Sequence, residues 1–239
     1  MNIYQLKIDI SVHSKHQAVF DVFLKGFKRT TQKFEDIRLF VVHKNHEIPE
    51  DKNIISIKTD DYGGKVQNEI LIRYTLKEQR DVFGYFNDDL WFVDGWLEDA
   101  LNLLNTFQVS SCGYVETDQK SVFLNAVEIT QDEGGAVNLP YMPAALINTT
   151  VFRRIGLFAE GMKAGPEDLD FVWRMCLNNV TSATAKSIKM AHSGTINKDP
   201  KWKDGRTDAK TLFYNRHGYQ SYRDLLNLYK EHCYFKQFR

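Results

Sequence analysis

The sequence predicts an α/β protein built on a mainly parallel central sheet with helices on its faces. Short runs that suit β-strands alternate with segments whose apolar residues repeat at helical spacing, in the order strand, helix, strand, strand, helix, strand. This alternation is typical of a parallel sheet whose strands are joined by helices. With 239 residues, 43% of them apolar, the chain is long enough to bury a sizeable core. We expect a single domain over residues 1–239, with a helical C-terminal extension over 208–239.

The elements of the first half follow from these patterns in order. Residues 6–13 alternate and are rich in β-formers, and residues 18–27 carry their phenylalanines at helical spacing. Residues 37–43 and 54–58 are nearly continuous apolar runs, as expected of strands covered on both faces. Residues 68–79 then suit a helix. A further strand at 81–86 ends abruptly in three polar residues.

The second half is less regular. Residues 110–116 and 121–130 suit strands, and residues 151–156 suit the start of a short helix. A longer helix is predicted over 167–179, and the run at 187–192 ends a strand at His192.

Composition narrows the function classes and the setting. Lysine plus arginine and aspartate plus glutamate number 31 each, so no net charge recruits nucleic acid or an anionic membrane. Lys7 and Asp9 interrupt the N-terminal run that a signal peptide would need, and no stretch is long and apolar enough to span a bilayer. The three cysteines lack disulfide or zinc spacing, so we expect a cytoplasmic protein without membrane insertion.

The polar residues that follow strands matter most, because ligands of such sheets bind outside the carboxyl ends of the strands. The richest cluster is Asn87-Asp88-Asp89. Adjacent carboxylates at the end of a buried strand repel each other and lose solvation, and a divalent cation such as Mn²⁺ or Mg²⁺ compensates both effects. The alternative is a turn that provides a cap for a helix in residues 91–104.

Two further sites carry candidate chemistry. Glu167 and Asp168 open a predicted helix, where a carboxylate beside a cleft can serve as a general base. The alternative is that both acids only favour the positive end of the helix dipole. His192 ends a strand and could ligate a metal, or it could be an ordinary strand-end histidine.

The order and spacing of these segments resemble family 2-like glycosyltransferases of the GT-A fold. Residues 87–101 (NDDLWFVDGWLEDAL) are similar to that family's acidic segment, and residues 142–175, with RRIGLF before EDLD, are similar to its acceptor-side stretch. The segments HSGT (192–195) and YNRHG (214–218) resemble later family elements. The glycine-containing segment DYGGKVQN (61–68) resembles the loop before the acidic motif.

The resemblance implies a metal-dependent, inverting transfer of a sugar from a nucleotide-sugar donor to an acceptor hydroxyl. Asp168 would be the catalytic base with Glu167 beside it, and Asp89 and His192 would bind Mn²⁺ or Mg²⁺. The donor would meet the remaining candidates, which are Asp88, Asn87, Gly64, Lys65 and Asn68.

The nucleotide and the acceptor stay open. Residues 41–47 carry no acid at the end of the second strand, where the family often has one that reads the nucleobase. The acceptor could be a glycan, a protein, a small molecule or a modified nucleobase. Two rival functions are a sugar-nucleotide nucleotidyltransferase, which usually carries a glycine-rich loop after the first strand that this chain lacks, and a non-catalytic glycan- or nucleic-acid-binding module.

Overall fold

The computed structural model of the 239-residue chain describes residues 2–61, 63–116, 142–161 and 166–192, together with Asn215 and Gly218. Several predictions lie outside these described residues: the strand at 121–130, the HSGT segment after His192, and the C-terminal extension except for Asn215 and Gly218.

The described residues pack as two compact units. The first unit comprises residues 2–60, 70–116, 142–149 and 182–192 and contains every described strand. The second comprises residues 61, 63–69, 150–161 and 166–181 with Asn215 and Gly218. Whether the chain is a single domain, as the sequence predicts, stays a prediction.

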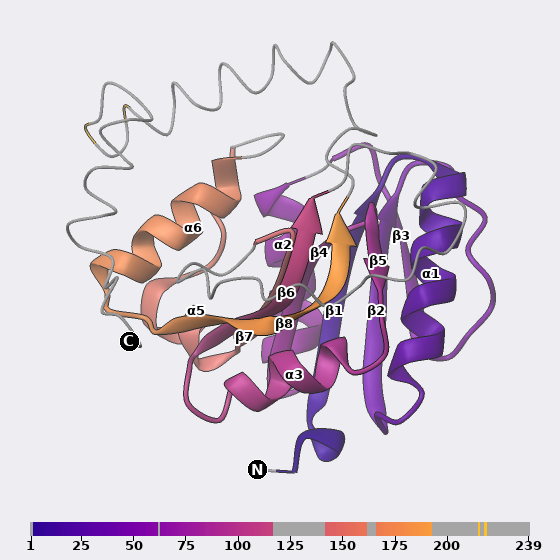
Figure 1. Cartoon of the computed structure of the whole chain (residues 1–239). Helices are drawn as coiled ribbons and strands as arrows, with labels where there is room; N and C mark the ends of the chain where they lie inside the picture. Colours follow the sequence, from indigo (N-terminus) through magenta and orange to yellow (C-terminus); the bar gives the residue numbers. More distant parts are fainter. Residues whose placement is uncertain are drawn as a thin grey trace. The chain divides into compact units, whose positions relative to one another are not determined.

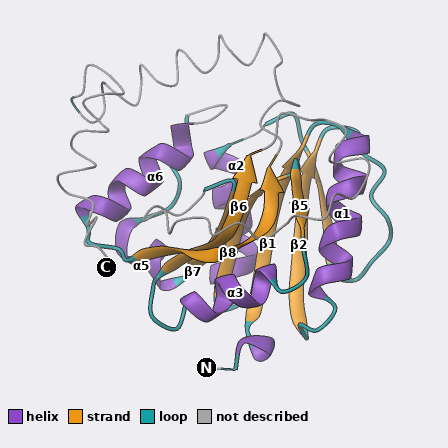
Figure 2. Ribbon diagram, in the orientation of Figure 1, coloured by secondary structure: helices purple, strands orange, loops and turns teal. Residues whose placement is uncertain are grey.

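The first unit is built on one sheet. Its strands are β1 (Lys7–Ser14), β2 (Asp36–His43), β3 (Ile54–Lys58), β4 (Val82–Asn87), β5 (Leu90–Phe92), β6 (Val109–Glu116), β7 (Ala144–Asn148) and β8 (Ser182–His192). Its helical elements are the 3₁₀ turn η1 (Ile3–Gln5), α1 (Gln17–Thr31), the π-helix η2 (Leu71–Leu76) and α3 (Trp96–Leu103). Figure 2 distinguishes these helices from the strands by colour.

The strands lie in the order β3-β2-β1-β4-β7-β6-β8-β5. Among them, β1 to β4, β6 and β8 run in one direction, and β5 and β7 run in the other. The arrowheads of β6 and β8 accordingly point the same way in Figure 1. The predicted α/β class with a mainly parallel sheet is confirmed. The carboxyl ends of six strands therefore meet at one edge, which we call the carboxyl edge.

Alternation along β1 assigns the two faces of the sheet. Ile8, Ile10 and Val12 are fully buried in a core that also holds the apolar side of α1 and of α3. Asp9 points to the opposite face, where it accepts a hydrogen bond from Thr75 of η2 at 2.9 Å. The first unit is thus a sheet with helices on both faces.

The core face is dominated by aromatic side chains. Phe92 of β5 lies 5.3 Å from Phe23 of α1 and 4.5 Å from Trp96 of α3, measured between ring centroids. The indole N–H of Trp96 donates to Thr30 Oγ1 at 2.8 Å, which satisfies the one polar group of this buried ring. The ring contacts of β5 therefore fix the residues immediately after the acidic cluster.

The second unit contains α2 (Gly64–Ile70, up to Glu69), α5 (Thr150–Ile155) and α6 (Pro166–Leu177). Phe158 packs on Phe152 and Phe171, with centroid separations of 5.9 and 4.7 Å. The predicted helices at 151–156 and 167–179 are both present, within two residues of their predicted bounds. In the part of the chain that the structure describes, no helix is long and apolar enough to cross a bilayer.

Candidate active site

The acidic cluster lies at the carboxyl edge of the first unit. Asn87 is the last residue of β4, and β5 begins directly after Asp89 at Leu90. Both carboxyl groups are withdrawn from solvent, since Asp88 is 3% exposed and Asp89 is 2% exposed. Two adjacent acids buried at the end of a strand are costly unless something compensates their charge.

Strand β5 brings His192 to this cluster. It pairs antiparallel with the end of β8, with Leu90 opposite His192. Nε2 of His192 consequently lies 3.2 Å from Oδ1 of Asp89 and 3.5 Å from the side-chain amide of Asn87. The structure therefore brings His192 beside Asn87 and Asp89, although more than a hundred residues separate it from them in the sequence.

The alternative interpretation of the cluster as a helix cap is wrong. Helix α3 does not begin until Trp96, and its cap residue is Gly95 in the left-handed region at φ 83°. Because a strand intervenes, neither Asp88 nor Asp89 can cap this helix. A side chain is also disfavoured at Gly95, because its φ is one that glycine tolerates and other residues rarely adopt.

Asp88 is held by the end of β1. Its Oδ2 accepts a hydrogen bond from the hydroxyl of Ser14 at 2.6 Å and a longer one from the main-chain N–H of Lys15 at 3.4 Å. Burial, together with the smaller effect of the neighbouring Asp89 charge, raises the pKa of Asp88 to about 7 against the opposing effect of the Ser14 bond. The protein alone therefore does not favour the doubly ionised state of the pair.

The part of the chain that the structure describes offers these two acids no cationic partner. Among the described residues, no lysine or arginine forms an ion pair with Asp88 or Asp89. The imidazoles of His13, His43 and His46 do not supply positive charge at neutral pH either. Burial lowers the pKa of His13 to about 4, with Lys15 adding to the shift, and burial also lowers the pKa values of His43 and His46.

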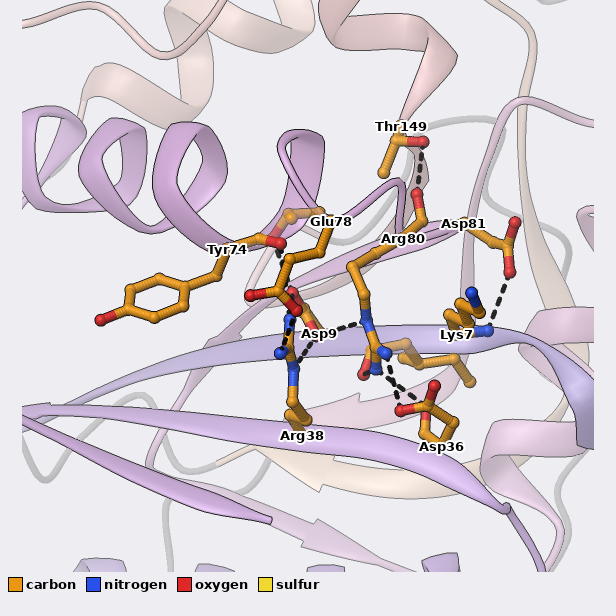
Figure 3. Close-up of polar contacts among 11 residues, drawn as sticks. Lys7, Asp9, Asp36, Arg38, Tyr74, Glu78, Arg80, Asp81 and Thr149 are labelled. Carbon is orange, nitrogen blue, oxygen red and sulfur yellow. Dashed lines mark hydrogen bonds and ion pairs between the residues drawn. The ribbon is translucent and has the colours of Figure 1, made fainter. Parts of the chain in front are cut away.

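A second buried acid in the same unit, Asp9, has charged partners. Asp9 of β1 is fully buried, and Figure 3 shows two arginines converging on it. Arg38 donates to both of its oxygens at 2.8 Å, and Nε of Arg80 donates to Oδ1 at 2.9 Å. Its charge is therefore compensated within the chain.

The arginines around Asp9 are themselves fully engaged. Arg80 also pairs with Asp36 at 2.6 Å and donates to two main-chain carbonyls, and Arg38 pairs with Glu78 at the surface. Thr149 donates its hydroxyl hydrogen to the carbonyl of Arg80 at 2.9 Å (Figure 3). This closed network is a structural feature and presents nothing to a ligand.

The acidic pair, in contrast, fits a divalent cation. Oδ1 of Asp89 is buried and has no hydrogen-bond partner among the described residues, and Nε2 of His192 lies 3.2 Å from it. An oxygen and an imidazole nitrogen are suitable ligands for Mn²⁺, and oxygen suits Mg²⁺. The described residues contain no group of three such ligands. A cation here would complete its coordination with donor phosphate oxygens or water.

The predicted base lies in the second unit. Glu167 and Asp168 occupy the first turn of α6, where the helix dipole favours carboxylates. Glu167 is only 3% exposed, whereas Asp168 is partly exposed. Of the two side chains, that of Asp168 is the more exposed.

The EDLD segment also has a structural role that sequence reasoning missed. Asp170 is fully buried and accepts a bond from Nε of Arg174 at 2.8 Å, one helical turn later. The two Nη atoms of Arg174 donate to the carbonyls of Ile155 and Leu157 at 2.6 and 2.7 Å. The Asp-x-x-x-Arg spacing thus fastens the RRIGLF turn to α6, and this i,i+4 spacing was the available signal.

The remaining predicted donor ligands also belong to the second unit. The amide of Asn68 is buried and bonds in both directions with the main chain of Phe158, at 2.8 and 2.9 Å. Gly64 packs so closely on Ala159 that a Cβ there would collide with the carbonyl oxygen of that residue. Lys65 is exposed. Asn68 and Gly64 hold the 158–159 turn, and a role of these three residues toward a donor stays a prediction.

Comparison with known proteins identifies the fold. The sequence matches no protein-family model and no curated protein. Among solved structures it is similar to TarS 1–349 of S. aureus, with a TM-score of 0.55, 13% identity and 79% of this chain covered. It is also similar to the mannosyltransferase PcManGT of Pyrobaculum calidifontis in complex with GDP-Man and Mn²⁺, with a TM-score of 0.62, 12% identity and 90% covered.

These likenesses establish the fold that the sequence predicts, that of nucleotide-sugar glycosyltransferases of the GT-A type. The matches cover 60% of the TarS chain and 64% of the PcManGT chain, so this chain corresponds to somewhat less than two thirds of each.

Proposed function

We propose that this protein is a metal-dependent glycosyltransferase that transfers a sugar, with inversion, from a nucleoside diphosphate sugar to an acceptor hydroxyl. The fold it shares with a mannosyltransferase that carries GDP-Man and Mn²⁺ supports this assignment. The donor would be held partly by Asn87 and Asp88.

One observation carries the proposal. The buried pair Asp88–Asp89 has no lysine or arginine partner among the described residues, while the equally buried Asp9 has two. This difference between Asp9 and the pair, seen among the described residues, supports a ligand as the partner of Asp88 and Asp89. A divalent cation bound together with a diphosphate is such a ligand.

Asp89 and His192 would hold the cation, because the orphaned Oδ1 of Asp89 and Nε2 of His192 lie 3.2 Å apart at the carboxyl edge. A bound Mn²⁺ or Mg²⁺ would neutralise charge that develops on the departing diphosphate. The residues of the chain then need only orient the donor and accept the proton of the acceptor.

We assign the proton acceptor to Asp168. It lies in the first turn of α6, where the helix dipole favours a negative charge, and its side chain is partly exposed. Glu167 is buried and is the weaker candidate. With a single base and direct displacement by the acceptor oxygen, the anomeric configuration would invert.

A thermal-shift screen tests the function. UDP, GDP, dTDP and CMP sugars, with GDP-mannose as the first probe, are added with and without Mn²⁺. A ligand at about 100-fold its Kd stabilises the folded state by about 2.7 kcal/mol, which raises the melting temperature measurably. We expect Mn²⁺-dependent stabilisation by at least one donor. A sugar 1-phosphate with a nucleoside triphosphate stabilising the protein, and no donor doing so, would instead indicate a nucleotidyltransferase.

The base assignment is tested by Asp168→Asn, which keeps the shape of the side chain. We expect donor affinity to survive and the rate of sugar transfer to fall by roughly 10²- to 10⁴-fold, as is typical when a general base is removed. Glu167→Gln is the matched control and should transfer at near the wild-type rate. A fast Asp168→Asn variant together with a slow Glu167→Gln variant would move the base to Glu167.

A further inference from the structure

The hydroxyl of Ser14 joins two side chains that are far apart in the sequence. Ser14 ends β1 and is fully buried. Its Oγ lies 2.6 Å from Oδ2 of Asp88, to which it donates, and 2.7 Å from Nε2 of His46. A hydroxyl has a single hydrogen, so with Asp88 ionised the second contact must be donated by the imidazole. Nε2 of His46 therefore carries a hydrogen.

His46 is in turn fixed by its surroundings. Its main-chain N–H donates to Nδ1 of His43 at 2.8 Å, and the two rings stack with centroids 5.5 Å apart. Nδ1 of His43 accepts, so Nε2 of His43 carries the hydrogen and donates to Ser56 Oγ at 2.7 Å. The ring of Phe20 in α1 lies 5.8 Å from the ring of His46. A series of hydrogen bonds thus runs from Ser56 of β3 through His43, at the end of β2, and His46 to the acidic pair.

These hydrogen bonds give the two carboxylates different orientations. Asp88 is drawn toward the end of β1 by Ser14, whereas Asp89 faces His192 on β8. Adjacent carboxylates repel, so without the Ser14 bond Asp88 would have no side-chain donor to hold it in this orientation. The bond thereby decides which acid faces the metal ligand and which is left for the remainder of the donor.

We propose that Ser14 and His46 are positioning residues of the glycosyl transfer, which orient Asp88 for the donor and act on the reaction only through Asp88. This rests on the proposed function. Packing alone does not require a hydroxyl at the end of β1, since an alanine would fit the strand.

The first test measures affinity for GDP and for UDP with Mn²⁺ by calorimetry. Loss of a hydrogen bond to a charged group weakens binding by roughly 10- to 100-fold, which is the loss expected for Ser14→Ala. Ser14→Thr, which keeps the hydroxyl, and His46→Gln, which keeps an N–H at the same distance along the side chain, should stay close to wild type. If Ser14→Ala does not fold, His46→Leu breaks the same chain one bond further out and should show a smaller loss of the same kind.

Ser11→Ala is the matched control. Ser11 is a fully buried serine on the same strand, and its Oγ has no hydrogen-bond partner in the described part of the chain. The same substitution there should leave nucleotide affinity unchanged. In an Asp88→Asn background, Ser14→Ala should add little further loss, because residues that act through one another are non-additive. Full additivity would contradict the positioning role.

The ring nitrogen shifts of His46 provide a readout that needs no nucleotide. At a pH at which Asp88 is ionised, NMR of the wild type should show the tautomer with hydrogen on Nε2, and the opposite tautomer would overturn the hydrogen-bond chain. Wild-type protein that binds none of UDP, GDP, dTDP and CMP with Mn²⁺ would contradict the proposed function and the positioning role together. Wild-type binding that Ser14→Ala leaves intact would contradict the positioning role alone.

Discussion

Two groups of buried acids lie on the same sheet and differ in one respect. Asp9, in the first half of β1, is surrounded by Arg38, Arg80 and Thr75, which together occupy both of its oxygens. After the end of β4, Asp88 accepts a hydrogen bond from a hydroxyl and Asp89 lies beside the imidazole of His192, but neither acid pairs with a lysine or arginine among the described residues. The comparison teaches that burial of an acid is not by itself a sign of function. The missing countercharge is the informative feature.

The largest change in unfolding free energy is expected when an arginine is removed from the network around Asp9. Arg80→Met leaves Asp9 buried with one arginine fewer, and removing one partner of a buried ion pair typically costs about 3–5 kcal/mol of unfolding free energy. Urea unfolding measures it. Lys28→Met is the control, because Lys28 pairs with Asp51 at the surface with 43% of its side chain exposed, and such pairs contribute less than about 1 kcal/mol. Equal costs for the two variants would contradict the structural role of the network.

Replacing Asp88 of the acidic pair should raise the unfolding free energy, whereas replacing Arg80 should lower it. Because the folded pKa of Asp88 is raised from 3.8 to about 7, the native state keeps a proton that the unfolded chain releases, and stability falls as the pH rises between these values. Asp88→Asn removes this loss. At about pH 8 and without metal we expect the variant to be more stable than wild type by about 2–4 kcal/mol, and at about pH 4 by much less. A variant less stable than wild type at both pH values would show that the chain compensates Asp88 after all.

A smaller effect is expected at His13, which also lies at the carboxyl edge. Its folded pKa of about 4 is below the unfolded value of 6.5, so its contribution to stability is present above pH 6.5 and is lost as the pH falls toward 4. His13→Phe should reduce this acid sensitivity by about 1–3 kcal/mol. Urea unfolding of both proteins above and below this window measures the difference. An unchanged pH dependence would mean that His13 is charged in the native state and could offset the acids.

Much of the fold could be predicted because its signals are local. The runs at 37–43 and 54–58 and the helical spacing at 18–27 correspond to β2, β3 and α1. Strand β5 could not be predicted, because three residues carry no period and its partner β8 is almost one hundred residues away. The position of β7, antiparallel between β4 and β6, likewise depends on pairing between distant segments.

The candidate site likewise contains residues that could be predicted from the sequence and residues that could not. The sequence indicated the acids and His192 because each follows a strand, and the parallel arrangement brings strand ends together. It did not indicate Ser14, whose role depends on the register that places the end of β1 beside the end of β4. Nor did it reveal that Arg38 stands opposite Asp9 in the ladder, which makes one acid structural and leaves the pair for a ligand.

The central claim is that the Asp88–Asp89 pair awaits an external cation, and Asp89→Asn tests it most directly. Calorimetry with GDP and UDP, in the presence and absence of Mn²⁺, compares this variant with wild type and with Asp94→Asn, an exposed acid five residues later that pairs with Arg29. We expect Mn²⁺-dependent binding in the wild type and in Asp94→Asn, and none in folded Asp89→Asn. Mn²⁺-dependent binding of wild-type strength in Asp89→Asn would contradict the account.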